Sequence, residues 1–112
     1  MKKLEIIIRP EKLEDLKIAL TECGISGMMV TTVMGFGNQM GHTQQYRGTT
    51  YSVNLVSKLR VETVVAKDSV DEIVDVITAK IRTGNVGDGK IFISPVDDAV
   101  RVRTGEKGSE AL

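Results

Sequence analysis

Residues 58–95 decide the fold and read KLRVETVVAKDSVDEIVDVITAKIRTGNVGDGKIFISP. The part 58–66 alternates polar and aliphatic side chains, as in a strand with one face exposed to water. Between positions 70–81, apolar residues recur three and four apart, which is the spacing of an amphipathic helix. The apolar run Lys90–Ser94 then predicts a second strand, which Pro95 ends. This stretch therefore predicts a strand–helix–strand unit.

Two local signals mark the ends of this helix. Ser69 followed by Glu72 matches a capping box, in which the hydroxyl and the carboxylate each accept a backbone N–H of the first turn. Gly84 is the stop signal after the last apolar position. We therefore expect a helix that begins at Ser69 and ends before Gly84.

The N-terminal part repeats the same order. The Ile-rich run Leu4–Arg9 predicts a strand, and apolar residues at helical spacing over 13–23 predict a helix that Gly24 stops. The segment 28–34 alternates Val and Met with Thr and predicts a strand ending at Gly35. Two such units in succession predict an α+β fold of the ferredoxin-like split βαβ type (βαββαβ), with both helices on one face of an antiparallel sheet.

The helices of such a fold leave the other face of the sheet open. Depending on the parity of the strands, which the pattern leaves undecided, this face includes some of Ile7, Met29, Thr31, Val33 and Val64. A partly apolar open face is typical of an association surface. We therefore expect a homo-oligomer whose sheets pack about a symmetry axis.

Composition excludes several classes of protein. The chain has 112 residues, enough for a single domain with one core, and its 15 Lys and Arg balance 15 Asp and Glu. Zero net charge argues against a general binder of nucleic acid or anionic membranes. A single Cys excludes an internal disulfide and a Cys-cluster metal site. The charged N-terminus, followed by only a short apolar run, fits neither a signal peptide nor a membrane span, so we expect a cytoplasmic protein.

A long segment, residues 37–55, joins the two units. It has no helical periodicity and little strand alternation, and its only formally charged side chain is Arg47. Connections in compact domains usually have about 4–6 residues, and longer ones are typically functional or disordered. We therefore expect a flexible loop without regular structure that carries binding or signalling.

The 82–90 loop is a candidate anion site. It has three glycines within 84–89, whose N–H groups could converge on an anion, and Lys90 supplies a point charge suited to phosphate. The spacing satisfies Gly-x-x-x-x-Gly-Lys, but Ile91 stands where a Walker A loop has Ser or Thr. The order of elements, helix to strand, is also the reverse of a Walker A loop. An anion loop and a plain turn after a helix stay equally open on this pattern.

Further residues carry charge or conformational freedom at the expected strand ends. In an extended segment, Arg101 and Arg103 would lie on the same side and suit a triphosphate, whereas a solvated tail is the alternative. Lys58 has two interpretations. It is either a charged residue that keeps the edge of a strand from pairing with another chain, or the counter-ion of a ligand carboxylate. Gly35 and Gly37 allow either a close ligand approach or a turn.

Taken together, these features resemble the PII signal transduction proteins, the trimeric nitrogen-status sensors of bacteria, archaea and plastids. The resemblance covers nearly the whole chain and implies one domain, 1–112, assembled as a homotrimer, with a flexible loop at about 37–55, a nucleotide loop at about 82–90 and a C-terminal segment at about 99–112. The most specific blocks are Gly24–Met28, Gly35–Gly37, Gly41–Thr43, Tyr46–Gly48 and Thr83–Phe92.

The resemblance implies a regulator, not an enzyme, that binds ATP or ADP between subunits. The expected nucleotide-binding residues are Gly35, Gly37, Asn38, Glu62, Val64, Gly87, Asp88, Gly89, Lys90, Arg101 and Arg103. Of these, Glu62 and Val64 would contact adenine, and the two arginines would come from the adjacent subunit. The resemblance also implies that Gln39, Gly41 and Lys58 bind 2-oxoglutarate, with Gln39 helping the ATP phosphates to hold Mg²⁺.

The implied partner is an ammonium transporter, whose cytoplasmic pore Arg47 at the loop tip would enter. The protein would then be cytoplasmic and recruited peripherally to the membrane by that transporter. Transcriptional regulators and nitrogen-metabolism enzymes are further candidate partners, and we expect no direct binding to nucleic acid. Tyr51 matches a position that is modified in some members.

The chain departs from the family pattern at several of these positions. Thr49 and Thr50 replace the usual Ala-Glu before the modified tyrosine, which leaves its modification open. Asn38 stands where many members have a basic residue beside the phosphates, so we expect a smaller preference for ATP over ADP than is usual. Met29 replaces a Thr expected near adenine, which removes a hydroxyl partner of the purine. The alternatives are a small ferredoxin-like ATP-binding enzyme, with Asp88 as its general base, or a regulator of another transporter without 2-oxoglutarate sensing.

Overall fold

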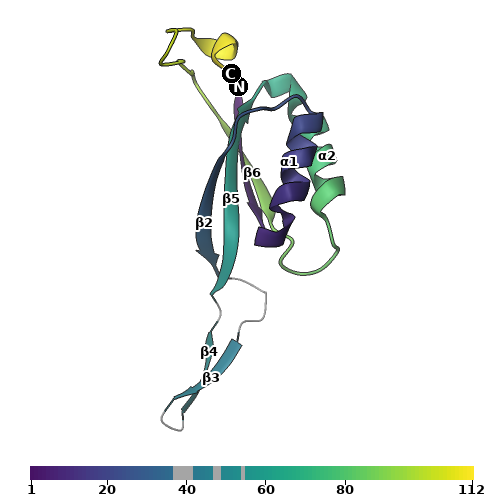
Figure 1. Cartoon of the computed structure of the whole chain (residues 1–112), viewed down its shortest axis with the longest axis vertical. Coiled ribbons are helices and arrows are strands. Elements are labelled where there is room, and N and C mark those ends of the chain that lie inside the picture. Colours follow the sequence, from purple (N-terminus) through teal and green to yellow (C-terminus); the bar gives the residue numbers. More distant parts are fainter. Residues whose placement is uncertain (37–41, 47–48, 54) are drawn as a thin grey trace.

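The computed structural model describes residues 1–36, 42–46, 49–53 and 55–112 (Figure 1). Its main elements in chain order are β1 (Lys2–Ile8), α1 (Leu13–Glu22), β2 (Met29–Gly35), β3 (His42–Tyr46), β4 (Thr49–Val53), β5 (Val56–Val65), α2 (Val70–Ile81) and β6 (Lys90–Pro95). Short 3-10 turns cover Pro10–Lys12, Lys67–Ser69 and Gly108–Ala111.

Four strands form one antiparallel sheet in the order β2-β5-β1-β6. β1 is the inner strand between β5 and β6, so that Ile6 lies opposite Val61 on one side and Ile91 on the other. Both helices lie on the same face of this sheet (Figure 1). The predicted α+β, ferredoxin-like split βαβ arrangement is therefore confirmed.

The core lies between this sheet and the helix layer and is aliphatic throughout. Leu4, Ile6 and Ile8 of β1 are 0% exposed, which is the alternation that a half-buried strand requires. The other buried apolar residues are Leu16, Ala19, Leu20, Val61, Val65, Val70, Ile73, Ile77 and Ile81. Each fully buried Leu or Ile contributes about 1.5–3 kcal/mol by removing its side chain from water.

Of the helix-end signals in the sequence, the stop after α1 is confirmed and the cap before α2 is not. α1 ends at Glu22, before the predicted stop Gly24. The φ of 78° at Gly24 lets its N–H donate to Thr21 O at 2.9 Å and the N–H of Ile25 donate to Leu20 O at 2.9 Å. The predicted capping box at the start of α2 is wrong, because the Ser69 side chain makes no capping hydrogen bond. Ser69 already has nearly helical backbone angles, since it is the last residue of the 3-10 turn Lys67–Ser69, which runs directly into the helix.

The structure decides which residues face away from the helices. Because Leu4, Ile6 and Ile8 point to the core, Ile7 faces the other way, and it lies directly opposite Arg60. The same register places Met29, Thr31, Val33 and Val64 on this face, which we call the open face. Met29 is 68% exposed. The five residues that the sequence offered as candidates for this face therefore all lie on it.

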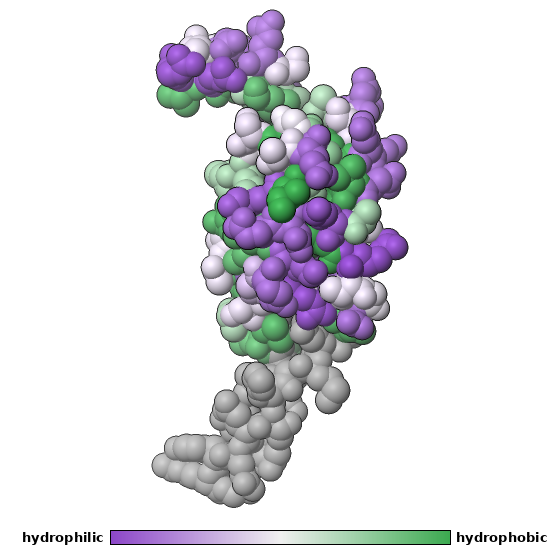
Figure 2. Space-filling view, turned by 45° about the vertical axis from the view of Figure 1, so that its right-hand side comes forward, coloured by the Kyte–Doolittle hydropathy of each residue, from purple (hydrophilic) through white to green (hydrophobic). Residues whose placement is uncertain are grey.

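The helix side of the molecule has a different character from the open face. Figure 2 turns α1 and α2 forward and shows mainly hydrophilic residues over them, with smaller hydrophobic areas between. Neither helix, nor any other in the described ranges, is long and apolar enough to cross a bilayer.

The expectation of a loop without regular structure over 37–55 is wrong in part. β3 and β4 pair as a two-stranded antiparallel sheet, from His42 opposite Val53 to Tyr46 opposite Thr49. β-Branched and aromatic residues are frequent in both strands and favour extended backbone. The alternation did not reveal them because Thr, Gln and Ser on both faces give no contrast between polar and apolar positions.

Gly89 stands at a position where the fold has no room for a side chain. Its φ is 113°, and a Cβ built there would lie 1.7 Å from Ile7 O, a backbone atom of the central strand. We predict that Gly89→Ala loses well over 2 kcal/mol in the free energy of unfolding, because the strand or the loop must move. Urea unfolding at one fixed protein concentration measures this loss.

Gly84 provides the matched control, because its φ is 87° but nothing lies within 4 Å of a Cβ built there. Gly84→Ala should lose only the roughly 1–2 kcal/mol of a left-handed backbone angle. Equal losses for the two variants would show that contact with Ile7 does not restrict Gly89.

Candidate functional site

The Asp88 carboxylate organises the 82–90 loop. It accepts the backbone N–H of Thr83 at 2.8 Å and that of Gly84 at 2.9 Å, and the Thr83 hydroxyl also donates to it. Arg9 Nε lies 3.6 Å from Asp88 Oδ1. These donors, first of all the Thr83 hydroxyl, lower the pKa of Asp88 to about 2. A carboxylate held in this way is a weak general base near neutral pH, which argues against the enzyme alternative.

Two cations hold the backbone carbonyls of the same loop. Arg9 Nη2 donates to Val86 O at 2.6 Å, and Lys58 Nζ donates to Gly87 O at 2.7 Å. In a trans peptide the C=O and the following N–H point in opposite directions. The N–H of Gly87 is therefore turned away from Arg9, and a donor placed in this way suits an anion-binding turn. The N–H of Asp88, in contrast, donates to Asn85 O at 3.3 Å and closes the turn.

Lys58 is buried at the start of β5, with 8% of its surface exposed. Burial lowers the pKa of its ammonium group, and the neighbouring Arg9 adds to the lowering. Gly35 approaches it from β2: a Cβ built at Gly35 would lie 3.4 Å from Lys58 Cγ. The structure thus brings together Gly35, Lys58 and the 82–90 loop, with Lys90 exposed at the end of that loop.

Glu62 and Val64 lie further along the open face. They line a groove of about 400 Å³ together with Lys3, Gly27, Met28, Met29 and Thr63. The Thr63 hydroxyl donates to Gly27 O at 2.7 Å and fixes one wall, while Arg60 Nε lies 3.3 Å from Glu62 Oε1. A carboxylate acceptor beside apolar walls suits a flat base with an amino group.

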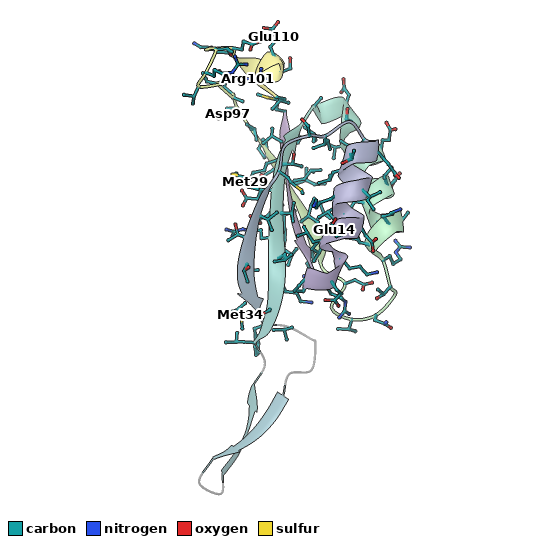
Figure 3. The ribbon with its side chains drawn as sticks, viewed as in Figure 1. Glu14, Met29, Met34, Asp97, Arg101 and Glu110 are labelled. Atoms are coloured by element: carbon teal, nitrogen blue, oxygen red, sulfur yellow. The ribbon has the colours of Figure 1, made fainter. Side chains whose placement is uncertain are left out.

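The prediction of an extended segment at Arg101 and Arg103 is wrong. The chain turns here, because Gly105 has a φ of 76° and its N–H donates to Arg101 O at 2.7 Å. Arg101 Nη1 donates to Glu106 Oε1 at 3.2 Å. Figure 3 shows Arg101 at the end of the molecule that holds both termini, whereas the 82–90 loop lies toward the other end (Figure 1). One chain does not bring these arginines to Lys90.

Several predicted site residues are not tested by this geometry. Gly37, Asn38, Gln39, Gly41 and Arg47 lie outside the described residues. Tyr51 is in β4, where only the backbone is described. The roles of these six residues stay predictions.

Two residues of the site were not predicted from the sequence. Arg9 reaches Val86 across 77 positions, so no local pattern could reveal it. Thr83, in contrast, stands five positions before Asp88, and a hydroxyl and a carboxylate flanking glycines are a recognisable turn signal. Within the described part of the chain, no group of three or more His, Cys, Asp or Glu side chains could hold a metal ion.

The pKa of Asp88 predicts a pH-dependent loop. Because this pKa is about 2 in the folded chain, below the ordinary 3.8, the ionised carboxylate stabilises the loop above about pH 4, and this contribution is lost as the pH falls toward 2. The protection factors of the Thr83 and Gly84 amides, which compare the observed exchange rate with the intrinsic rate at the same pH, should therefore fall over that range. In Asp88→Asn the exchange should be faster than native at pH 6, with a difference that shrinks toward pH 2; a difference independent of pH would contradict this role.

Comparison with known proteins identifies the family of the chain. A family model described as nitrogen regulatory protein P-II matches residues 1–106. Proteins named nitrogen regulatory protein P-II from Microchaete diplosiphon, Nostoc punctiforme and Synechocystis sp. are 58%, 57% and 56% identical over 112 residues, covering 100% of each chain. The chain therefore belongs to the nitrogen regulatory protein P-II family.

Proposed function

We propose that the chain is a nitrogen-status regulator that binds ATP or ADP together with 2-oxoglutarate and transmits its ligand state to a partner protein. The observation that carries this proposal is the 82–90 loop, whose carbonyls are held by Arg9 and Lys58 while Lys90 stands exposed beside it. Backbone donors next to a lysine suit a polyphosphate. Membership of the P-II family supports the regulatory role.

The nucleotide would bind between neighbouring copies of a homotrimer. Lys90 and the pair Arg101 and Arg103 lie at different ends of one chain, so a cleft containing all three needs a second copy (Figures 1 and 3). Met29 and Phe92 are exposed apolar side chains on the open face, and burying them against another copy would favour association. In this arrangement Arg101 would exchange its bond to Glu106 for one to phosphate.

Within each cleft, the adenine would enter the groove at Glu62 and Val64, and the phosphates would meet the 82–90 loop. Gly87 and Gly89 would offer backbone N–H groups, and Gly35 allows close approach beside Lys58. Gly37 and Asn38 would complete the site. The smaller preference for ATP over ADP, expected from Asn38, belongs to this proposal.

2-Oxoglutarate would pair one carboxylate with Lys58 and receive further contacts from Gln39 and Gly41. An anion suits this place, because it would offset the burial that disfavours the charged Lys58. Lys58 would then divide its donors between the ligand and Gly87 O, which joins this site to the nucleotide loop. Mg²⁺ would rely on Gln39 and the ATP phosphates.

The segment 37–55 would transmit the ligand state to the partner protein. Arg47 would enter the pore of an ammonium transporter, to which the cytoplasmic protein is recruited, and Tyr51 is a candidate modification site. Transcriptional regulators and nitrogen-metabolism enzymes are further candidate partners, each bound as a protein and without direct contact to nucleic acid. The role is regulatory and not enzymatic, in keeping with the engaged carboxylate of Asp88.

Lys90 tests the nucleotide site. We predict that Lys90→Gln weakens ATP binding by roughly tenfold or more, since a charged hydrogen bond contributes about 1.5–3 kcal/mol. The unfolding midpoint should be unchanged, because Lys90 is exposed. Calorimetry with ATP and ADP measures both affinities. Lys67→Gln, an exposed lysine in the turn before α2, is the matched control and should bind as the native chain does. Equal affinities for all three proteins would reject this site.

Lys58 tests the effector site separately. We predict that Lys58→Met, which keeps the buried alkyl chain, abolishes 2-oxoglutarate binding in the presence of MgATP, because the ligand loses its ion-pair partner. The measurement is calorimetry on the ATP-loaded protein. A native chain that binds ATP but not 2-oxoglutarate would instead favour the regulator of another transporter.

A further inference from the structure

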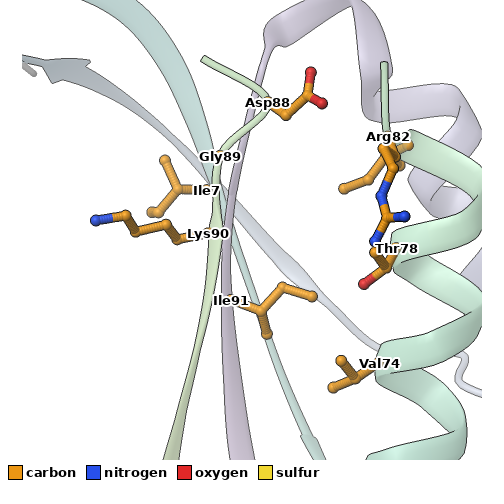
Figure 4. A pocket seen from close by; sticks show the side chains of 9 residues that line it. Ile7, Val74, Thr78, Arg82, Asp88, Gly89, Lys90 and Ile91 are labelled. Carbon is orange, nitrogen blue, oxygen red and sulfur yellow. The ribbon is translucent and has the colours of Figure 1, made fainter. Parts of the chain in front are cut away.

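A pocket on the helix side of the sheet is separate from the groove at Glu62. It lies between the second half of α2 and the beginning of β6 and has a volume of about 310 Å³, which is in the range of small-molecule sites (Figure 4). Its walls include Val74, Thr78 and Ile81 from α2, Arg82 at the end of that helix and Ile91 from β6. Its lining shares four residues with the 82–90 loop, namely Arg82, Asp88, Gly89 and Lys90.

The walls of this pocket are mainly aliphatic. Figure 4 shows Val74 from α2 and Ile91 from β6 at one end, with Asp88 at the other. Val74 and Ile91 are partly buried apolar residues that pack against the core. Ile81, on the same wall, is 8% exposed. A ligand would therefore need a short, compact alkyl portion to fill this end.

The polar residues of the pocket wall are Thr78, Arg82, Asp88 and Lys90, and Arg82 is the cation whose side chain runs along the helix wall (Figure 4). Arg82 follows the last residue of α2, and its guanidinium lies beside Thr78 on the helix wall (Figure 4). Within the described residues, this guanidinium forms neither a salt bridge nor a side-chain hydrogen bond. Asp88 does not neutralise it, because that carboxylate is engaged by Thr83, Gly84 and Arg9. The Lys90 side chain points away from Arg82 (Figure 4).

We propose that this pocket binds a short branched aliphatic carboxylate. Its alkyl chain would pack between Val74, Ile81 and Ile91, and its carboxylate would meet the guanidinium of Arg82, which offers paired donors in the matching plane. The Thr78 hydroxyl could supply another donor. A long fatty acid exceeds the volume, and a dicarboxylate would place its second charge against aliphatic walls.

The test uses the isotope-labelled full chain and 3-methylbutanoate as the probe. For about seven heavy atoms, the dissociation constant should be in the millimolar range. In an NMR titration we expect saturable shifts of the amides of Thr78, Gly89 and Ile91. The neutral 3-methylbutanamide, which has the same shape, should bind at least fivefold more weakly. No saturable shift up to about 50 mM, where a millimolar ligand saturates, overturns the proposal.

Variants separate this site from unspecific binding. Arg82→Gln removes an exposed side chain and should weaken the carboxylate at least fivefold while leaving the amide unaffected. Val74→Met narrows the apolar end and should weaken both probes. Lys80→Gln, an exposed lysine of α2 outside the pocket, is the matched control and should bind as the native chain does. Equal binding by Arg82→Gln, or shifts centred on Lys58, overturns the proposal. Neither result depends on whether the chain binds nucleotides.

Discussion

The alternation of the central strand β1 is the constraint on which both layers of the molecule depend. Leu4, Ile6 and Ile8 are fully buried against the helices, so Ile7 must face the other way. Because β1 pairs with strands on both sides, a slip of one residue would exchange the core and the open face. The same strand leads into Arg9, which reaches the 82–90 loop, so its register also positions the candidate site.

The 82–90 loop is shaped by charges held on both sides of its backbone. The Asp88 carboxylate accepts backbone N–H groups at one end of the loop. Arg9 and Lys58 donate to carbonyl oxygens near its middle. Each charge satisfies backbone groups that a short turn cannot pair with one another. The loop is thus kept in one conformation without a hydrophobic core of its own, and its glycines are free to approach a neighbouring backbone or an anion.

The parts of the structure that follow from local pattern were predictable, and those that depend on distant contacts were not. The stripe of α2 and the stop at Gly24 appear directly in the sequence, because periodicity and a positive φ are local properties. The β3–β4 hairpin was not predicted because its strands lack contrast between polar and apolar positions. The turn at Arg101 was not predicted because it depends on the hydrogen bond from the Gly105 N–H to Arg101 O. For the site, Asp88 and Lys58 were identified as residues, but the distant partners that they meet, Arg9 and Gly87, became visible only in the fold.

The separation of Lys90 and Arg101 within one chain has a genetic consequence for the proposed trimer. A variant that lacks Lys90 and one that lacks Arg101 would each be inactive as a pure population. In every mixed trimer, however, one cleft would combine the intact loop of one variant with the intact C-terminal segment of the other. Two defective alleles in the same cell could then complement each other, which is excluded for a site built from a single chain.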